Sequence, residues 1–165
     1  MDERSFLALY ETTVRPLRSY ITRVLGGAAQ ADDVLQESYL RLLRAPSIPT
    51  DPVELRAFLF RIAGNLMVDD WRRHRRERGT TLRAVAEAEA PRVNLTLRLD
   101  MARVFERLKP QHRQLLWLAY VEGASHREIA AALGVREASI RVLLHRARQR
   151  LAELLAAGRK PIGQG

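Results

Sequence analysis

The stretch EGASHREIAAALGVREASIRVLLHRARQRL, residues 122–151, predicts two helices separated by a tight turn. Ser125 is a favourable N-cap for the first helix, and Glu128 stands where a capping box requires it. Gly134 ends that helix, because glycine tolerates the left-handed conformation of a sharp stop. The buried side of the second helix is marked by apolar residues at helical spacing, namely Ile140, Leu144, Ala147 and Leu151.

The outward side of the second helix is rich in basic residues such as Arg141, His145 and Arg148. Two helices in this arrangement form a helix-turn-helix, whose second helix enters a DNA groove while the first braces it. An ordinary helical hairpin with a solvated basic face is the competing interpretation. The cap, the turn and the periodicity are in register, and together they favour the helix-turn-helix.

Size and composition limit the class of protein. With 165 residues, 47% of them hydrophobic, the chain fits one medium domain or two small helical domains with a real core. It contains no cysteine, which excludes disulfides and cysteine-ligated zinc and suits a reducing cytoplasm. No apolar run approaches the roughly 18 residues of a membrane span, and the polar start MDERSF predicts no secretory signal. We expect a cytoplasmic protein without membrane insertion, cofactor or metal.

The positive charge of the chain is clustered. The formal net charge is +9, and residues 97–165 carry 13 basic against 6 acidic side chains. The segment WRRHRRER, residues 71–78, holds five arginines against Glu77. Two basic patches at the ends of two modules indicate two contacts with one polyanion. Arginine grips phosphate and guanine edges in a bidentate way that lysine cannot.

Helical periodicity dominates the chain, and strand patterns are missing. The first predicted helix begins near Phe6, is kinked or split by Pro16 and ends at Gly26-Gly27. A proline-rich loop at 45–52 follows the second predicted helix. A local break is expected at Gly64-Asn65. The other predicted helices span residues 30–44, 53–78, 97–108 and 110–121.

The apolar stripe of the second predicted helix places five side chains inward: Val34, Leu35, Tyr39, Leu42 and Leu43. Residues 79–96 have a linker composition, with small and polar side chains and weak periodicity. We therefore expect an all-α fold of two small helical domains, residues 1–78 and 97–160, joined by a flexible linker. The tail after residue 158 is expected to be frayed.

A second motif, QADDVLQESYLRLLR at residues 30–44, carries a ridge of acidic and polar side chains. At helical spacing Asp32, Asp33, Gln36 and Glu37 lie together, opposite the buried face. A carboxylate ridge on a basic protein should not face DNA. A protein partner with basic residues is one interpretation, and a plain solvated face is the other.

A third motif, LRAFLFRIAGNLMVDDWRRHRR at residues 55–76, interleaves aromatic and basic residues. The residues concerned are Phe58, Phe60 and Trp71 among Arg56, Arg61, Arg72 and Arg73. Rings that stack on bases beside guanidinium groups that bind phosphates suit single-stranded nucleic acid. Phe58 and Phe60 fall on different faces, so at least one of them belongs to the core.

These three motifs, in this order, resemble an extracytoplasmic-function sigma factor, the smallest class of the sigma-70 family of bacterial RNA polymerase. The resemblance rests on DDVLQESYLRLLR, LRAFLFRIAGNLMVDDWRR and LKPQHRQLLWLAYVEGASHREIAAALGV followed by LHRARQRL. It covers nearly the whole chain. The helix-turn-helix alone is less specific, because output domains of LuxR-type response regulators share it.

The resemblance implies a function. The chain would bind core polymerase through its β′ and β subunits and direct promoter recognition, DNA melting and transcription initiation, under the control of an anti-sigma factor. Asp33, Gln36 and Glu37 match positions that dock on the β′ coiled coil. The linker would run toward the RNA exit path.

The resemblance also implies the promoter contacts. Asn65 matches a loop residue that helps to capture a flipped −10 base. Phosphates near the −10 element would be held by Arg72, Arg73, Arg75 and Arg76. The −35 element would be contacted by Arg136, Arg141, Val142, His145 and Arg146.

Two positions depart from the family's pattern. Arg136 stands where a capping serine is common, so the recognition helix lacks a side-chain cap worth roughly 1 kcal/mol. Val142 stands where serine is common, so only apolar contact, such as with a thymine methyl, is available there.

Two other classes of protein compete with this interpretation. A stand-alone helix-turn-helix regulator, a dimer on a palindrome, would carry a sensor or receiver domain with alternating strands, and none is visible. An enzyme would need a nucleophile with a positioned base or a spaced metal cluster. The four histidines are scattered along the chain and suit surface or phosphate-neighbour positions: His74, His112, His126 and His145.

The charge pattern also bears on the free protein. Two basic surfaces on a flexible tether would bind any DNA nonspecifically. We therefore expect the free chain to keep its two modules closed on each other or to be sequestered by an anti-sigma protein.

Overall fold

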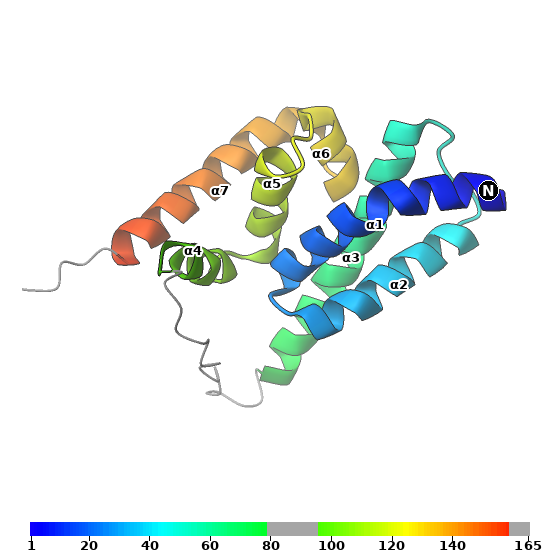
Figure 1. Ribbon diagram of the computed structural model, residues 1–165. Helices are drawn as coiled ribbons and strands as arrows, with labels where there is room; N and C mark the ends of the chain where they lie inside the picture. Colours follow the sequence, from blue (N-terminus) through cyan, green and yellow to red (C-terminus); the bar gives the residue numbers. More distant parts are fainter. Residues whose placement is uncertain (79–95, 159–165) are drawn as a thin grey trace, which may run out of the picture.

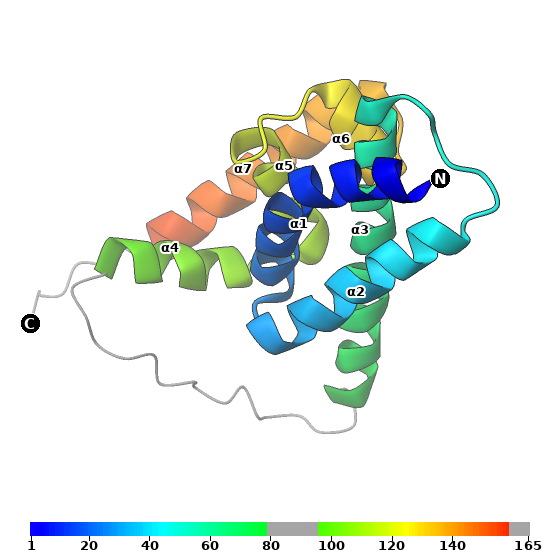
Figure 2. The ribbon, with the colours of Figure 1, turned by 45° about the vertical axis from the view of Figure 1, so that its right-hand side comes forward.

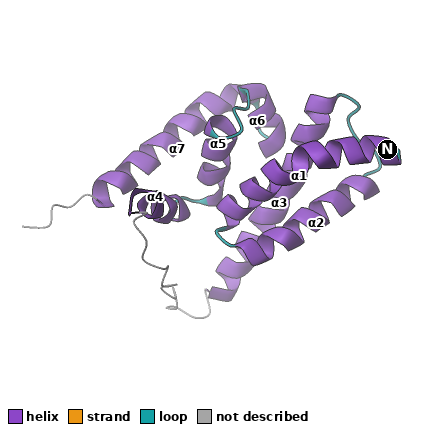
Figure 3. Ribbon diagram, viewed as in Figure 1, coloured by secondary structure: helices purple, strands orange, loops and turns teal. Residues whose placement is uncertain are grey.

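The computed structural model describes residues 1–78 and 96–158, and all regular secondary structure in these two ranges is α-helical (Figures 1 and 3). The first domain contains α1 (Glu3–Leu25), α2 (Ala28–Arg44) and α3 (Pro52–Arg78). The second domain contains α4 (Thr96–Glu106), α5 (Pro110–Tyr120), α6 (His126–Leu133) and α7 (Glu137–Gly158). The expectation of an all-α fold with two helical domains is confirmed. The predictions for the linker and the tail lie outside the described residues, apart from Thr96 at the start of α4.

Helix α1 runs through the proline that was expected to kink or split it. Asp2 caps its start by accepting a hydrogen bond from the Ser5 N–H at 2.7 Å. Pro16 lies inside the helix without ending it, and Figure 2 shows that α1 changes direction along its length. Gly26 ends the helix with φ 78°, a conformation that glycine adopts without steric penalty. Proline therefore bends this helix, and glycine terminates it.

Two predictions about burial and helix continuity are wrong. Leu43 was placed inward, but it is 51% exposed, because the buried stripe of α2 passes through Tyr39 and Leu42 instead. No break occurs at Gly64-Asn65, and α3 is continuous from Pro52 to Arg78. Gly64 is buried, and a Cβ atom on it would lie 2.9 Å from Gln114 Nε2. This glycine permits close approach of the second domain rather than a turn.

The apolar stripes of both domains meet in one core. Its fully buried members include Leu17, Tyr20, Ile21, Leu42, Leu59 and Met67 of the first domain and Leu115, Ile129 and Ile140 of the second. A buried hydrogen bond of 2.7 Å joins the hydroxyls of Thr13 on α1 and Tyr39 on α2. This bond satisfies both polar groups inside the core.

The two domains pack directly against each other. Helix α6 lies against α3, and α5 lies against α1 and α3 (Figure 2). The arrangement brings the helix-turn-helix onto the helix that carries the aromatic and arginine motif. The chain is closed in this structure, in agreement with the first of the two arrangements expected for the free protein.

Candidate nucleic-acid and polymerase interfaces

The helix-turn-helix forms as its sequence predicts. The Ser125 hydroxyl accepts the Glu128 N–H at 3.2 Å, and the Glu128 carboxylate accepts the Ser125 N–H at 2.9 Å, which completes a capping box. Gly134 ends α6 with φ 66°, and its N–H bonds to the Ala130 carbonyl. These caps fix the start and end of α6 and set the direction in which α7 leaves the turn.

Helix α7 presents a basic face to solvent. Ile140, Leu144 and Ala147 are buried as predicted, whereas Leu151 is half-buried. The positions expected at the −35 element are all exposed: Arg136, Arg141, Val142, His145 and Arg146. Val142 is 51% exposed, an apolar side chain among basic neighbours. The face combines cationic and hydrogen-bonding side chains with one exposed apolar side chain.

Arg136 directly precedes the first residue of α7, Glu137. Its carbonyl accepts the Ser139 N–H at 3.0 Å, and Glu137 supplies the acidic side chain that favours a helix N-terminus. An arginine side chain has no acceptor with which to cap the remaining free N–H groups.

Helix α3 carries an exposed polar face that includes Asn65. Asn65, Arg72 and Arg76 recur at i, i+7 and i+11, so they share one side of the helix, and all three are exposed. The expectation that Asn65 lies in a loop at a helix break is wrong, because Gly64 continues the helix. Arg73 and Arg75 are also exposed and flank this side.

The aromatic residues of the third motif divide between core and surface. Phe60 is 3% exposed and belongs to the core, while Phe58 is half-buried. Trp71 is half-buried, and the Arg75 guanidinium lies 5.2 Å from its ring centroid. Within this motif, the end of α3 therefore places an aromatic ring in contact with an exposed arginine.

The acidic ridge of α2 faces solvent. Arg18 donates to Asp32 at 2.9 Å, and Arg41 donates to Glu37 at 2.8 Å. Asp33 and Gln36 are exposed and make no hydrogen bond within the described parts of the chain. The two intramolecular ion pairs are exposed and weak, so all four side chains are available to a partner.

Two exposed leucines extend this ridge, and the helical pattern of the sequence did not predict their exposure. Leu40 is 44% exposed and Leu43 is 51% exposed, on the same outward side of α2 as Asp33 and Gln36. Exposed leucines beside carboxylates are typical of a protein-binding surface rather than a solvated face. The sequence did carry a signal for them: residues 30–44 contain more apolar side chains than one buried side of a helix can hold.

The histidines do not assemble a site. His74 Nδ1 lies 2.9 Å from the Asp70 carbonyl oxygen, which ties it to its own helix. Burial, together with the charges of Lys109 and Arg150, lowers the pKa of His112. In residues 1–78 and 96–158, no group of three or more histidine and acidic side chains could hold a metal ion. Neither does any helix there have the length and apolar character needed to cross a membrane.

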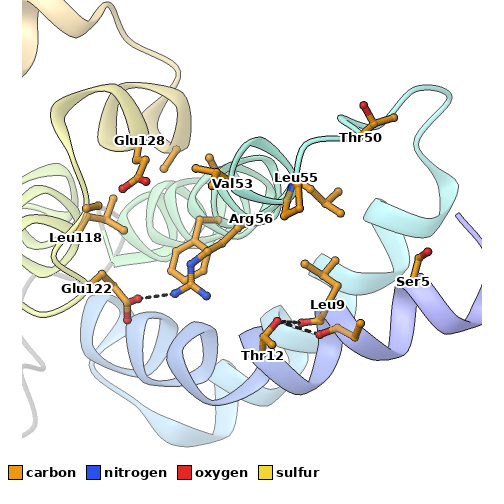
Figure 4. A pocket seen from close by; sticks show the side chains of 16 residues that line it. Ser5, Leu9, Thr12, Thr50, Val53, Leu55, Arg56, Leu118, Glu122 and Glu128 are labelled. Carbon is orange, nitrogen blue, oxygen red and sulfur yellow. Dashed lines mark hydrogen bonds and ion pairs between the residues drawn. The ribbon is translucent and has the colours of Figure 1, made fainter.

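A cavity of about 650 Å³ lies at the junction of the two domains (Figure 4). Side chains of α1 and α3 form one wall, and residues of α5, α6 and their connection form the other. The Arg56 guanidinium donates to the Glu122 carboxylate at 2.6 Å across the cavity and lies 4.9 Å from the Phe60 ring centroid. The Glu122 side chain is 13% exposed and the Arg56 side chain is 38% exposed, so this ion pair between domains is partly shielded from water.

Comparison with known proteins assigns both domains. The family model of Sigma-70 region 2 matches residues 9–77, and that of Sigma-70, region 4 matches residues 98–151. The ECF RNA polymerase sigma factor SigL of Mycobacterium tuberculosis is 36% identical over 144 residues, covering 84% of this chain and 81% of SigL. The chain belongs to the ECF sigma factors. The ferric citrate uptake sigma factor FecI of Escherichia coli is 33% identical and covers 83% of each chain.

Solved structures show the same fold. The structure of CnrH in complex with the cytosolic domain of CnrY has a TM-score of 0.67 and 28% identity, covering 94% of this sigma factor and 90% of CnrH. RpoE of Bartonella quintana, in complex with the anti-sigma factor NepR, has a TM-score of 0.69 at 22% identity, covering 94% and 99% of the two chains. Helices α1–α3 correspond to region 2, and α4–α7 correspond to region 4.

Proposed function

We propose that this sigma factor docks on core RNA polymerase through α2 and brings it to a promoter through α3 and α7, without enzymatic activity of its own. The observation that carries the proposal is the separation of charge between exposed faces. The outward side of α2 combines Asp33 and Gln36 with two leucines, whereas the exposed side of α7 is basic. A nucleic acid would be repelled by the first face and attracted by the second.

The polymerase contact is the outward side of α2, formed by Asp33, Gln36, Glu37, Leu40 and Leu43. The acidic members would meet basic groups of the β′ coiled coil, and the leucines would supply the apolar centre of the interface. Because Glu37 is already paired with Arg41 by an exposed bond, the polymerase could replace that partner at little loss of free energy.

The promoter contacts divide between the two domains. Arg141, Val142, His145 and Arg146 of α7 would read the −35 element, and Arg136 would bind an adjacent phosphate. Asn65 would act from the side of α3 near the −10 element, with four arginines toward the end of the helix on the backbone phosphates: Arg72, Arg73, Arg75 and Arg76. In this proposal, residues 1–78 form the unit that binds core polymerase and the −10 element, and residues 97–160 form the unit that binds the −35 element.

Control by an anti-sigma protein in the cytoplasm completes the proposal. It is supported by two structures of the same fold bound to a second protein, RpoE with the anti-sigma factor NepR and CnrH with the cytosolic domain of CnrY. In the described residues, the cavity at the domain junction and the exposed faces of α2 and α7 are surfaces that an inhibitor could cover.

Capture by core polymerase tests the proposal. The variant carrying Asp33→Arg and Glu37→Arg should lose at least about tenfold in affinity for core, since each reversal turns attraction into repulsion. The matched control reverses Glu3 and Glu11, two exposed carboxylates on α1, and should bind core like the natural chain.

A second double variant, Leu40→Ala with Leu43→Ala, tests the apolar part of the surface. It should raise the rate of dissociation from core with little change in salt dependence. Equal core affinity of the natural chain and both double variants would reject α2 as the docking helix. A chain that binds duplex DNA specifically but never binds core would be a stand-alone regulator instead.

A further inference from the structure

The closed chain is too small to contact both promoter elements at once. The −10 and −35 elements lie about 25 base pairs apart, which is about 85 Å along B-form DNA. A compact chain of 165 residues has a radius of gyration of about 15 Å, and therefore a diameter of about 40 Å. The two domains must separate before α3 and α7 can engage one promoter. This step rests on the proposed function, whereas the closure itself is a property of the free chain.

Where α3 meets the second domain, the residue on the α3 side is a glycine, Gly64, which has no side chain. Gly64 of α3 is buried, and a Cβ atom there would lie 2.9 Å from Gln114 Nε2, 3.7 Å from the Tyr20 hydroxyl and 3.9 Å from the Ala132 carbonyl oxygen. Tyr20 belongs to the first domain, while Gln114 and Ala132 belong to the second. A Cβ at position 64 would displace the Gln114 amide, which is buried at 3% exposure, while its distances to Tyr20 and Ala132 would be ordinary van der Waals contacts.

The polar groups around Gly64 depend on closure. Gln114 is 3% exposed, and burial raises the pKa of the Tyr20 hydroxyl, with the Gln114 side chain beside it as the offsetting group. That hydroxyl has no hydrogen bond of good geometry to any described residue. An incompletely satisfied polar pair weakens the closed state, since each buried group would be hydrated once the domains separate. Packing therefore stabilises the closed state, while these incompletely satisfied polar groups reduce the free energy needed to open it.

Two short hydrogen bonds at the rim add to this packing. Arg113 of α5 donates through Nη1 to the Val24 carbonyl at the end of α1, at 2.6 Å. Arg56 and Glu122 join α3 to the segment after α5, also at 2.6 Å. Both contacts cross from one domain to the other and would be lost on opening.

From this geometry we infer that Gly64 is a positioning residue that sets the balance between the closed and open forms of this sigma factor. Glycine at this position lets the second domain seat on α3. Any side chain at position 64 meets Gln114 and shifts the population toward the open form, in which the two DNA-binding faces are free to move apart.

The test is the distance between the domains in the free, full-length chain. Because the sequence contains no cysteine, Ser47→Cys and Ala152→Cys provide two unique dye positions, one exposed on each domain. The natural chain should show mainly high energy transfer. Gly64→Leu should lose most of the high-transfer population and show a larger radius of gyration by small-angle scattering.

The matched control is Gly158→Leu, which places the same side chain on a helical glycine with no atom within 4 Å. It should keep the energy transfer of the natural chain. A Gly64→Leu chain that unfolds cooperatively and retains the natural energy transfer would overturn the inference. Energy transfer in the free chain tests closure, whereas capture by core polymerase tests the proposed function, so the two can fail independently.

If Gly64→Leu prevents folding, a less disruptive pair of substitutions tests the same contact. Gly64→Ala adds one methyl group and favours the helix, since alanine is the better helix former, so it separates closure from the stability of α3. Gln114→Ala removes the group that this methyl meets. The inference requires that Gly64→Ala lower the high-transfer population in the natural background and do so less in the Gln114→Ala background. Equal effects in both backgrounds would reject the contact.

Discussion

Arg141 and Arg146 lie five residues apart on α7, about 500° around the helix, so they point to either side of the line that faces the groove. Arg141 is nearer the helix N-terminus, the end that enters the groove in a helix-turn-helix. We expect Arg141 to read a base edge and Arg146 to hold a phosphate.

Substitution of these two arginines should therefore give different results. Arg141→Ala should lose about 1–3 kcal/mol of binding free energy and relax the preference at one position of the −35 element. Arg146→Ala should weaken binding to all sequences alike and flatten its salt dependence. Holoenzyme binding to a library of −35 sequences measures both. An unchanged sequence preference in the Arg141 variant would reject its assignment.

His112 gives the stability of the fold a pH dependence. Burial, reinforced by Lys109 and Arg150, lowers its pKa below the ordinary value of 6.5. The unfolded chain then binds the proton more readily than the folded chain, so the contribution of neutral His112 is present above pH 6.5 and is lost as the pH falls below it. Thermal unfolding of the natural chain and of His112→Gln between pH 5 and 8 should show a shallower slope for the variant. Replacing the exposed His126 by glutamine should leave that slope in place.

Single residues show where sequence reasoning succeeds and where it stops. Ser125 and Gly134 could be assigned from sequence, because their caps depend on neighbours three or four residues away. Gly64 could not, since the reason for that glycine is Gln114, fifty positions along the chain and in the other domain. The exposure of Arg141 could be predicted because a helical period alone separates it from the core, whereas Val142 was proposed for the −35 contact from the resemblance to the family.

Among the elements, α7 begins without a side-chain acceptor. Arg136→Ser should supply one for the first turn and raise the free energy of unfolding by about 1 kcal/mol, or the melting temperature by about 2–4 °C. Ser125→Ala, which removes the existing cap of α6, should lower stability by a similar amount.

The same Arg136→Ser change should weaken promoter binding, because the exposed arginine is expected to hold a phosphate. Calorimetry and a promoter-binding titration on one preparation therefore check both effects. Unaltered stability would show that backbone bonds such as that between Ser139 N–H and the Arg136 carbonyl already satisfy this helix end.

The ends of the helices could be predicted from the local sequence, whereas the continuity of α3 could not. The starts and ends set by Ser125, Gly26 and Gly134 agree with the structure. The expected break in α3 failed because glycine's low helix propensity, about 1 kcal/mol, is smaller than the packing gained when α3 stays straight beneath α6. The width of the apolar stripe of α2 was likewise overestimated at Leu43, since one helix face accommodates only part of its leucines.

At the scale of the whole molecule, the ion pair between Arg56 and Glu122 connects the domains. Glu122→Gln should lower the free energy of unfolding by about 0.5–1.5 kcal/mol, because Arg56 loses the charge of its partner but keeps a neutral acceptor, and the Arg56 side chain is 38% exposed. Thermal unfolding at low and high salt measures this effect. The natural chain should lose part of its stability in salt, and the variant should lose less.

Glu153→Gln is the matched control for that prediction. Glu153 pairs with Arg150 on the surface of a single helix, so its loss should change stability by well under 1 kcal/mol. Equal effects of the two substitutions would mean that the pair between domains contributes no more than a surface pair.

The sequence predicted two helical domains but not the way in which they dock. Periodicity identifies the buried side of each helix, yet it cannot tell which part of that side faces a neighbour in the other domain. Gln114, buried at the junction, has no pattern in the sequence that marks it as an interface residue. The expectation of closure came from the net charge instead, which carries no information about geometry.

The bond from Arg113 to the Val24 carbonyl also limits how evolution can act on this junction. Its acceptor is a main-chain oxygen, which every amino acid provides, so no codon change at position 24 that preserves α1 can delete it. Of the two residues that form this link, only Arg113, on the side of the second domain, can be changed so as to remove the bonding group itself. A lineage that needs a more readily opened factor therefore has one gene position, not two, at which to weaken this contact.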